Sequence, residues 1–168
     1  MKAIQIDNFF EDVNLIYNEC KKLKFYTQAE HPLNKDRITT TWPGKRTVEL
    51  GECNLLLKYF LTKYYIINNL ITPNSEVNFY VHARFDGDDK EEWIHQDKNN
   101  ISSLIYLSHN NLQSGTKLYT FKNHQEINDF KFVQNRLIQY DGLYYHSAYG
   151  SHGTTIDNCR LTINGFIK

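Results

Sequence analysis

The chain has 168 residues, and 19 lysine and arginine residues are balanced by 19 aspartate and glutamate residues. This length predicts one hydrophobic core and a single domain over residues 1–168, and the neutral charge excludes a broad basic surface for nucleic acid or anionic membranes. Three widely spaced cysteines (Cys20, Cys53 and Cys159) argue against a disulfide framework or a thiolate zinc site and favour a reducing cytoplasm.

The N-terminal segment combines acidic residues with isolated apolar ones. MKAIQIDNFFEDV has no continuous apolar stretch, so we expect neither a signal peptide nor a membrane span there. A stripe with the helical period of 3.6 begins within it and consists of Phe10, Val13, Tyr17 and Cys20. Asn8 and Glu11 have approximately the spacing of a capping box, which predicts a helix start near Asn8.

A second helical pattern runs from about Cys53 to Leu70. The residues expected on one apolar face are Leu56, Tyr59, Phe60, Tyr64 and Ile67. The polar segment 31–47 lies between the two helices, and its Pro43-Gly44 pair predicts a turn. We interpret this segment as a surface loop, with the alternative that its basic residues lie at the mouth of a site.

From Glu76 onward the apolar residues alternate with polar ones, as in half-buried strands. The expected strands are 76–85, 101–107, 116–121, a short pair within 130–140, and 159–167. Short strands with long loops and two leading helices predict a mainly β (α+β) fold, a sandwich or jelly roll with helices packed outside. Residues 1–75 would form a mostly helical support, and residues 76–168 would form the jelly-roll core.

His95 and Asp97 are two residues apart in WIHQD, so on extended backbone their side chains leave the same face. A distant second imidazole, His146, would complete a two-His-one-carboxylate set, which leaves coordination positions open and is typical of non-haem Fe(II) oxygenases. Catalytic zinc sites use the same residue types. His152 is a rival for the second histidine. We favour His146 because it directly follows an apolar strand, whereas His152 lies between glycines.

Arg160 begins the last strand, RLTINGFI, and shares one face with Thr162. An arginine in such a strand must be paired or solvated, because burying its charge alone is costly. A guanidinium with a hydroxyl two residues away can bind a carboxylate through a bidentate pair and a hydrogen bond. The alternative is an internal salt bridge. The position of Arg160 shortly after His146 favours carboxylate binding.

These motifs resemble those of the Fe(II)- and 2-oxoglutarate-dependent dioxygenases, in particular the compact prolyl-hydroxylase-like branch. The resemblance covers about Val77 to Lys168. RFDGDDKEEWIHQD resembles the strand, turn and first-ligand segment of that family. ISSLIYLSHNNLQSGTKLYTF resembles its next hairpin, with Gly115 and Thr116 where the family usually has a Gly-Gly-x-Thr type turn. NRLIQYDGLYYHSAYG resembles the strand with the second histidine, and CRLTINGFI the closing strand with the basic residue. The resemblance implies a double-stranded β-helix, which is a form of jelly roll.

The resemblance also implies a role for each motif residue, with Fe(II), 2-oxoglutarate and O2 as cofactors. The implied metal ligands are His95, Asp97 and His146. The implied receptor for the distal carboxylate of 2-oxoglutarate is Arg160 with Thr162 and Tyr106, and Tyr80 is a further pocket candidate.

The sequence departs from the family pattern in two places. Phe85 stands where many prolyl hydroxylases have a tyrosine, and a long loop, YGSHGTTIDN, precedes Arg160. Phe166 stands where the related nucleic-acid demethylases have a second arginine, which argues against a nucleic-acid substrate. Trp93 shares the parity of His95 and either walls the pocket or belongs to the core.

The implied activity is hydroxylation of a C–H bond on a prolyl or peptidyl substrate, with release of succinate and CO2. Candidate substrate contacts near the mouth are Arg84, Trp42, Lys45 and Arg46. Two alternatives stay open: a small-molecule, amino-acid-like hydroxylase, and a non-catalytic metal-binding jelly-roll module. We expect a peptide, protein or small-molecule partner and neither a nucleic-acid nor a membrane partner.

Overall fold

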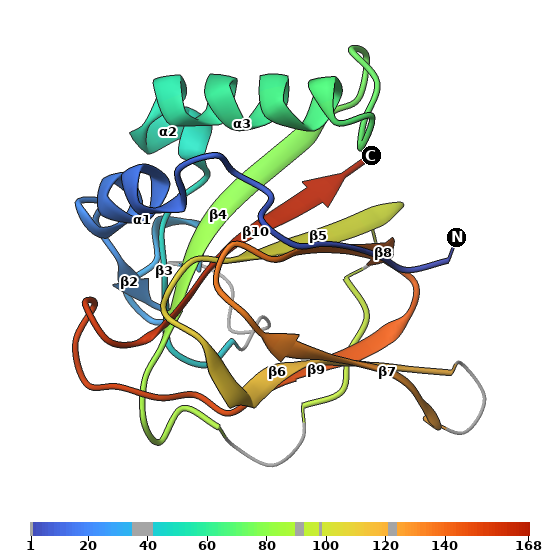
Figure 1. Ribbon diagram of the computed structural model, residues 1–168. Helices are drawn as coiled ribbons and strands as arrows, with labels where there is room; N and C mark the ends of the chain where they lie inside the picture. Colours follow the sequence, from blue (N-terminus) through green and yellow to red (C-terminus); the bar gives the residue numbers. More distant parts are fainter. Residues whose placement is uncertain (1, 35–41, 90–92, 98, 121–123) are drawn as a thin grey trace.

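Two antiparallel β-sheets face each other, and helices cover the outer face of the larger sheet (Figure 1). The computed structural model describes residues 2–34, 42–89, 93–97, 99–120 and 124–168. The strands are β1 (Ile4–Ile6), β2 (Tyr26–Thr27), β3 (Lys45–Arg46), β4 (Val77–Arg84), β5 (Ile101–Tyr106), β6 (Asn111–Tyr119), β7 (Glu126–Phe132), β8 (Leu137–Asp141), β9 (Tyr145–Tyr149) and β10 (Arg160–Ile167). The larger sheet has the order β1-β8-β5-β10-β4-β3-β2, and the smaller sheet has the order β7-β6-β9. The predicted mainly β jelly roll with outer helices is confirmed.

The two central strands of the larger sheet separate an apolar outer face from a polar inner face. β4 and β10 pair in an antiparallel register that runs from Arg84 opposite Arg160 to Val77 opposite Ile167. Alternate residues of these strands, such as Val81 and Ile163, are fully buried in the core cluster that includes the helices. The intervening residues face the smaller sheet, as the bonds of Arg160 to β6 show. The predicted alternation therefore places the polar candidates of the sequence inside the barrel.

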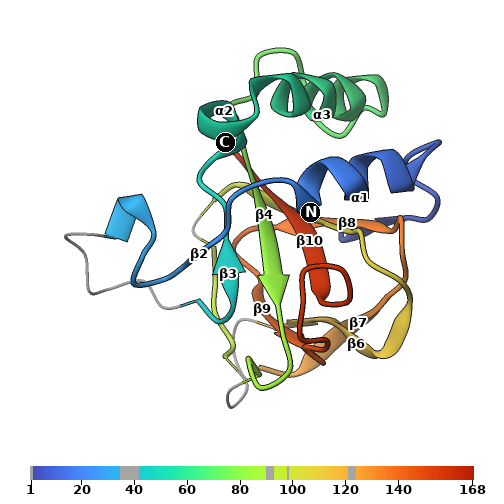
Figure 2. The ribbon, with the colours of Figure 1, turned by 90° about the vertical axis from the view of Figure 1, so that its left-hand side faces the viewer.

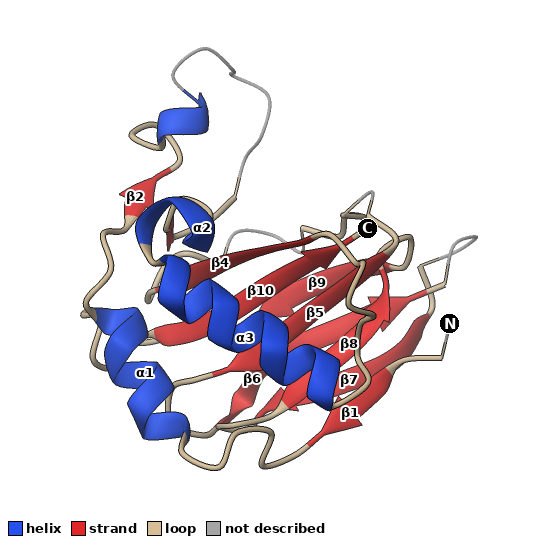
Figure 3. Ribbon diagram, turned by 90° about the horizontal axis from the view of Figure 1, so that it is seen from above, coloured by secondary structure: helices blue, strands red, loops and turns tan. Residues whose placement is uncertain are grey.

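The helices lie across the outer face of the larger sheet (Figure 3). They are α1 (Val13–Lys21), α2 (Leu50–Cys53) and α3 (Leu55–Ile67), with a short 3-10 turn η1 (Pro32–Asn34) between the first two. The side chain of Asp12 caps α1, because its carboxylate accepts the backbone N–H groups of Asn14 and Leu15. The predicted helix start at Asn8 was wrong: this residue has a φ of 53° and lies outside the helix. Within the described residues, no helix is long and apolar enough to cross a membrane.

The second predicted helix corresponds to α3, which the short helix α2 precedes, and its buried face differs from the prediction. Asn54 ends α2 and caps α3, since its side-chain oxygen accepts the N–H of Leu57 at 3.0 Å. The buried residues of α3 are Leu57, Leu61 and Tyr65, whereas Leu56 is 78% exposed. Most of the predicted face is exposed (Leu56, Tyr59, Phe60 and Ile67). Both faces are apolar, so the period alone did not identify the one that meets the sheet.

The segment 31–47 contributes β3 to the larger sheet, between β4 and the edge strand β2 (Figure 2). β3 pairs with β4, and Arg46 lies opposite His82. The turn at Pro43-Gly44 is present: Gly44 has a φ of 80°, and a Cβ there would lie 2.3 Å from the carbonyl oxygen of Ala83. Residues 35–41 of the predicted loop lie outside the described residues. The basic end of this segment is thereby fixed beside the inner face.

Candidate active site

His95, Asp97 and His146 come together at one end of the barrel. Their candidate ligand atoms all lie within 4.8 Å of one another. His95 and His146 exchange two backbone hydrogen bonds, which hold the first-ligand segment against β9. The Nε2 atom of His95 lies 3.6 Å from one carboxylate oxygen of Asp97, and the Nε2 atom of His146 lies 3.4 Å from the other. Two ligands at right angles, each about 2.1 Å from an ion, would be about 3 Å apart, so a metal ion fits after small side-chain adjustments.

Backbone carbonyls orient both imidazole rings. The Nδ1 atom of His95 lies 3.2 Å from the carbonyl oxygen of Trp93, and Nδ1 of His146 lies 3.2 Å from that of Tyr144. A carbonyl can only accept, so the proton of each neutral ring belongs on Nδ1 and the Nε2 lone pair faces Asp97. This is the tautomer that binds a metal through Nε2.

The local electrostatics favour a neutral imidazole at His95. Burial lowers the pKa of His95 to about 4, with repulsion from His146 in the same direction and attraction by Asp97 opposing it. The hydroxyl of Ser102 donates a 2.7 Å hydrogen bond to Asp97. The indole of Trp93 stacks on the His95 ring at 3.7 Å between centroids while remaining 44% exposed. Trp93 therefore covers a candidate ligand and is not a core residue.

Arg160 lies inside the barrel with only 2% of its surface exposed. Its guanidinium donates to the Ser114 hydroxyl at 3.2 Å, the Gly115 carbonyl at 3.2 Å and the Thr116 hydroxyl at 3.4 Å. Within the described part of the chain, no carboxylate lies within ion-pair distance of it. The internal salt bridge that the sequence left open is thus not formed there, and a buried charge is held by neutral oxygens.

The other predicted members of the carboxylate receptor are divided between two places. Tyr106 is fully buried, its ring lies 5.7 Å from the Arg160 guanidinium, and its hydroxyl donates to Thr116 at 2.9 Å. Thr162 is also fully buried, and its hydroxyl donates to Asn164 at 2.8 Å. Tyr80 lies elsewhere, with its ring 4.1 Å from the Arg46 guanidinium. The structure therefore brings Tyr106 beside Arg160 and does not bring Tyr80 there.

Tyr140 connects the metal-ligand cluster with the arginine interior. Its ring centroid lies 5.2 Å from that of His146. Burial raises the pKa of Tyr140 well above its usual range, the charge of Asp97 adds to the rise, and Arg160 opposes it. The charges of Asp97 and Arg160 thus both act on Tyr140, so the predicted metal site and the predicted carboxylate receptor share one interior. No role was predicted for Tyr140, because its only notable feature in the sequence is its place in an apolar strand.

Two further basic residues line the inner face. Arg84, predicted near the mouth, lies opposite Arg160 in the sheet and pairs with Asp89 at 2.7 Å. Burial and the repulsion of Arg160 lower its pKa to about 10. His82 donates its Nε2–H to the Pro43 carbonyl at 2.7 Å, and burial lowers its pKa to about 3, so the ring is neutral. Arg84 thus lies at the Arg160 end of β4, and its contact with substrate stays a prediction.

The remaining histidines are separate from the cluster. His152 packs its ring edge-on against Phe132, 5.9 Å away, and its Nδ1 lies 3.0 Å from the Gly150 carbonyl. It is not among the residues that approach Asp97. The geometry therefore places His146, and not its rival, with the first two candidate ligands.

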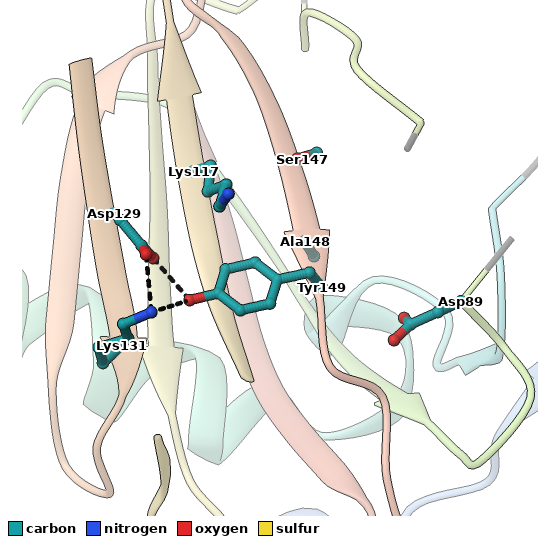
Figure 4. A pocket seen from close by; sticks show the side chains of 7 residues that line it. All are labelled: Asp89, Lys117, Asp129, Lys131, Ser147, Ala148 and Tyr149. Atoms are coloured by element: carbon teal, nitrogen blue, oxygen red, sulfur yellow. Dashed lines mark hydrogen bonds and ion pairs between the residues drawn. The ribbon is translucent and has the colours of Figure 1, made fainter. Parts of the chain in front are cut away.

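A hollow of about 310 Å³ on the smaller sheet was not anticipated from the sequence (Figure 4). It is lined by Asp89, Lys117, Asp129, Lys131, Ser147, Ala148 and Tyr149. Asp129 accepts the Tyr149 hydroxyl at 2.6 Å and the Lys131 ammonium at 2.7 Å, so these polar groups satisfy one another (Figure 4). The hollow contains none of the candidate metal ligands.

The same fold occurs in solved structures of non-haem iron oxygenases. A prolyl-4-hydroxylase from Pseudomonas putida has a TM-score of 0.67 at 15% identity, covering 99% of this chain and 92% of its own. The α-ketoglutarate-dependent epimerase SnoN from nogalamycin biosynthesis has a TM-score of 0.69 at 11% identity, covering 99% and 77%. This chain has the 2OG-Fe(II) oxygenase fold.

A viral collagen prolyl hydroxylase from Paramecium bursaria Chlorella virus 1 shares this fold, with a TM-score of 0.52 at 11% identity over 99% of this chain and 89% of its own. No protein-family model matches the sequence, and no curated protein sequence is significantly similar. The structures that share the fold include hydroxylases and an epimerase. The fold therefore does not select one reaction, and only the residues of the site can indicate the function.

Proposed function

We propose that this chain is an Fe(II)- and 2-oxoglutarate-dependent dioxygenase that hydroxylates a C–H bond. In the overall reaction one oxygen atom of O2 enters the substrate as a hydroxyl group, and the other enters succinate, which forms with CO2 from 2-oxoglutarate. The observation that carries the proposal is the convergence of two Nε2 atoms on the two oxygens of one carboxylate, at 3.6 and 3.4 Å.

The donor set favours an octahedral iron with open positions. His95, Asp97 and His146 supply two nitrogens and one oxygen, which is the combination found in non-haem Fe(II) oxygenases. Carbonyl groups hold both rings, and Ser102 holds the carboxylate, so the three ligands are oriented before an ion binds. Bound iron supplies the oxidising chemistry, and the protein supplies position and a protected interior.

Arg160 is suited to bind the distal carboxylate of 2-oxoglutarate. Its charge lacks a carboxylate partner in the described structure, and a bidentate carboxylate would supply one. Tyr106 lies beside it and shapes this end of the interior, although its hydroxyl already donates to Thr116. Thr162 and Tyr80 contribute less in this proposal, because Thr162 is bonded to Asn164 and Tyr80 lies against Arg46.

The prime substrate is proposed to be a prolyl or peptidyl group, or alternatively a small amino-acid-like molecule. The first follows from the sequence resemblance to prolyl hydroxylases, and two neighbours in fold carry that activity in their names. For a small-molecule substrate in general, a precedent in this fold is SnoN, which has been solved with nogalamycin RO. A nucleic-acid substrate is disfavoured by the neutral charge. The three unpaired cysteines fit the proposed cytoplasmic location.

Anaerobic titration with Fe(II) and 2-oxoglutarate tests the proposal. The iron chelate of a 2-oxo acid has a weak visible charge-transfer band, and we expect this band to appear at one equivalent of each. In parallel, Mn(II) with 2-oxoglutarate should raise the melting temperature more than Mn(II) alone, because each ligand binds only the folded protein. The absence of both effects would refute the dioxygenase reading and leave a non-catalytic jelly-roll module.

A further inference from the structure

A second guanidinium lies in an aromatic enclosure on the inner face. The centre of the Arg46 guanidinium lies 4.1 Å from the ring of Tyr80, 4.7 Å from that of Trp42 and 6.0 Å from that of Phe166. Its Nε atom is buried and lacks a hydrogen-bond partner, and so does Nε1 of Trp42. Within the described residues, no carboxylate lies within ion-pair distance of Arg46. Two buried donors thus remain unsatisfied beside a positive charge.

The strand register places this enclosure at the metal-ligand end of the barrel. Phe166 lies opposite Ser102 across β10 and β5, and Ser102 donates to the carboxylate of Asp97. The charge of Asp97 also acts on Arg46, opposing the lowering of its pKa by burial. The Arg46 enclosure therefore adjoins the proposed iron ligands.

The enclosure is distinct from the surroundings of Arg160. Arg160 and Phe166 are six residues apart on β10. The Arg160 guanidinium bonds to β6, whereas the Arg46 guanidinium lies among the rings of Trp42, which precedes β3, Tyr80 of β4 and Phe166 of β10, so the two arginines share none of these contacts. Between them on β4, His82 is neutral. Arg46 is thus not a second contact for the same carboxylate.

Charge balance leaves Arg46 without a counterion. In the loaded site, the two positive charges of iron and the one of Arg160 are matched by Asp97 and by the two carboxylates of 2-oxoglutarate. Arg84 is matched by Asp89. Arg46 remains, half-buried and unpaired by any described acid, where isolating a charge is costly. A monoanionic group of another ligand would satisfy it.

We propose that Arg46, enclosed by Tyr80, Trp42 and Phe166, binds a carboxylate of the prime substrate, which makes that substrate a small carboxylic acid of the amino-acid type. This inference rests on the proposed function and selects the small-molecule alternative over a chain-internal prolyl residue. An internal peptide unit carries no charge to match the guanidinium, whereas a free carboxylate accepts two of its N–H groups. The three rings would supply apolar contact to the body of the ligand.

The test compares acids with their amides on protein loaded with Mn(II) and 2-oxoglutarate. The probes are the twenty standard L-amino acids, their α-carboxamides and a blocked peptide with an internal proline, assayed by thermal shift and then by calorimetry. We expect at least one free amino acid to bind, with its carboxamide at least about 100-fold weaker, since losing two charge-assisted bonds costs several factors of ten. With Fe(II) and O2 the same acid should release succinate.

Variants assign the discrimination to Arg46. Arg46→Gln should bring the affinities of acid and amide within about threefold of each other while leaving the affinity for 2-oxoglutarate unchanged. Arg46→Lys keeps the charge without the fork and should retain part of the preference, which covers the case in which the glutamine variant does not fold. The matched control is Lys63→Gln, which removes an exposed charge on α3, outside the barrel, and should change neither affinity.

Each outcome either supports or overturns the proposal that Arg46 binds a carboxylate of the prime substrate. If no acid binds, if the amide or the blocked peptide binds equally well, or if both Arg46 variants keep the preference, the assignment is wrong. A fall in 2-oxoglutarate affinity in the Arg46 variants comparable to that in an Arg160 variant would place Arg46 in the cosubstrate site instead. A wild-type protein that shows neither the Fe(II)-2-oxoglutarate absorption band nor the rise in melting temperature with Mn(II) and 2-oxoglutarate refutes the proposed function itself, which separates the two failures.

Discussion

Replacement of Arg160 by methionine distinguishes a ligand-binding arginine from a structural one. The wild-type guanidinium is 2% exposed and is bonded only to neutral oxygens among the described residues. Methionine removes the charge and fills much of the volume, so a desolvation cost is relieved as hydrogen bonds are lost. We therefore expect the free energy of unfolding of the ligand-free protein to stay within about 1 kcal/mol of wild type.

The affinity for 2-oxoglutarate should change far more than the stability. A bidentate arginine-carboxylate pair has two charge-assisted hydrogen bonds, each contributing about 1.5–3 kcal/mol. Losing both costs roughly 3–6 kcal/mol, which corresponds to a rise in Kd of roughly 100-fold to 10,000-fold. The affinity for Mn(II) alone should stay at the wild-type value, because the proposed ligands of the ion are untouched.

Calorimetry with 2-oxoglutarate on the Mn(II)-loaded protein measures the affinity for 2-oxoglutarate, and urea unfolding measures the free energy of unfolding. Arg136→Met is the matched control, since that guanidinium pairs with Asp7 away from the interior. The control should bind 2-oxoglutarate as the wild type does. An Arg160→Met protein that is destabilised by more than about 2 kcal/mol yet binds 2-oxoglutarate normally would show that Arg160 is structural.

Three other substitutions probe the surroundings of the site. Ser102→Ala removes the hydroxyl that holds Asp97 and should weaken Mn(II) binding roughly tenfold in a spectroscopic titration, whereas Ser103→Ala, on the opposite face of the strand, should not. Burial lowers the pKa of His82 to about 3, so the unfolded chain binds an extra proton below pH 6.5 and stability falls with pH from 6.5 towards 3. In urea unfolding, the free energy of unfolding of the His82→Gln protein should fall by roughly 2 kcal/mol less than that of wild type between pH 6.5 and 5. Identical pH profiles of the two proteins would contradict the lowered pKa of His82. Tyr106→Phe should cost about 1 kcal/mol of stability and weaken 2-oxoglutarate binding less than Arg160→Met does; a larger loss of binding would mean that the hydroxyl contacts the ligand.

The sequence predicted the elements whose pattern has a single interpretation. β4 and β10 alternate strictly enough that their inner and outer faces could be assigned. The helix in residues 53–70 could not be oriented, because Leu56 and Leu57 are equally apolar and only packing against the sheet distinguishes them. The start of α1 was misplaced because Asn8 and Asp12 are both good capping residues.

The site was predictable where the residues are close in sequence or match a family motif. Parity placed His95 and Asp97 on one face, and the resemblance supplied His146 and Arg160. The role of Ser102 and the position of Arg46 depend on strand pairing, which one sequence does not encode in a readable pattern. The contact of Tyr80 with Arg46 could not be predicted for the same reason, since β3 was expected to be loop.

The chain contains two tryptophans, and both lie at the proposed site. The indole of Trp93 is stacked on His95, and that of Trp42 lies 4.7 Å from the Arg46 guanidinium. When tryptophan is excited selectively over the 12 tyrosines, the emission of the protein therefore originates beside these two residues. Trp93 would report metal binding, and Trp42 would report binding of a substrate carboxylate at Arg46. Single-tryptophan variants therefore provide an optical assay for each step without any attached label.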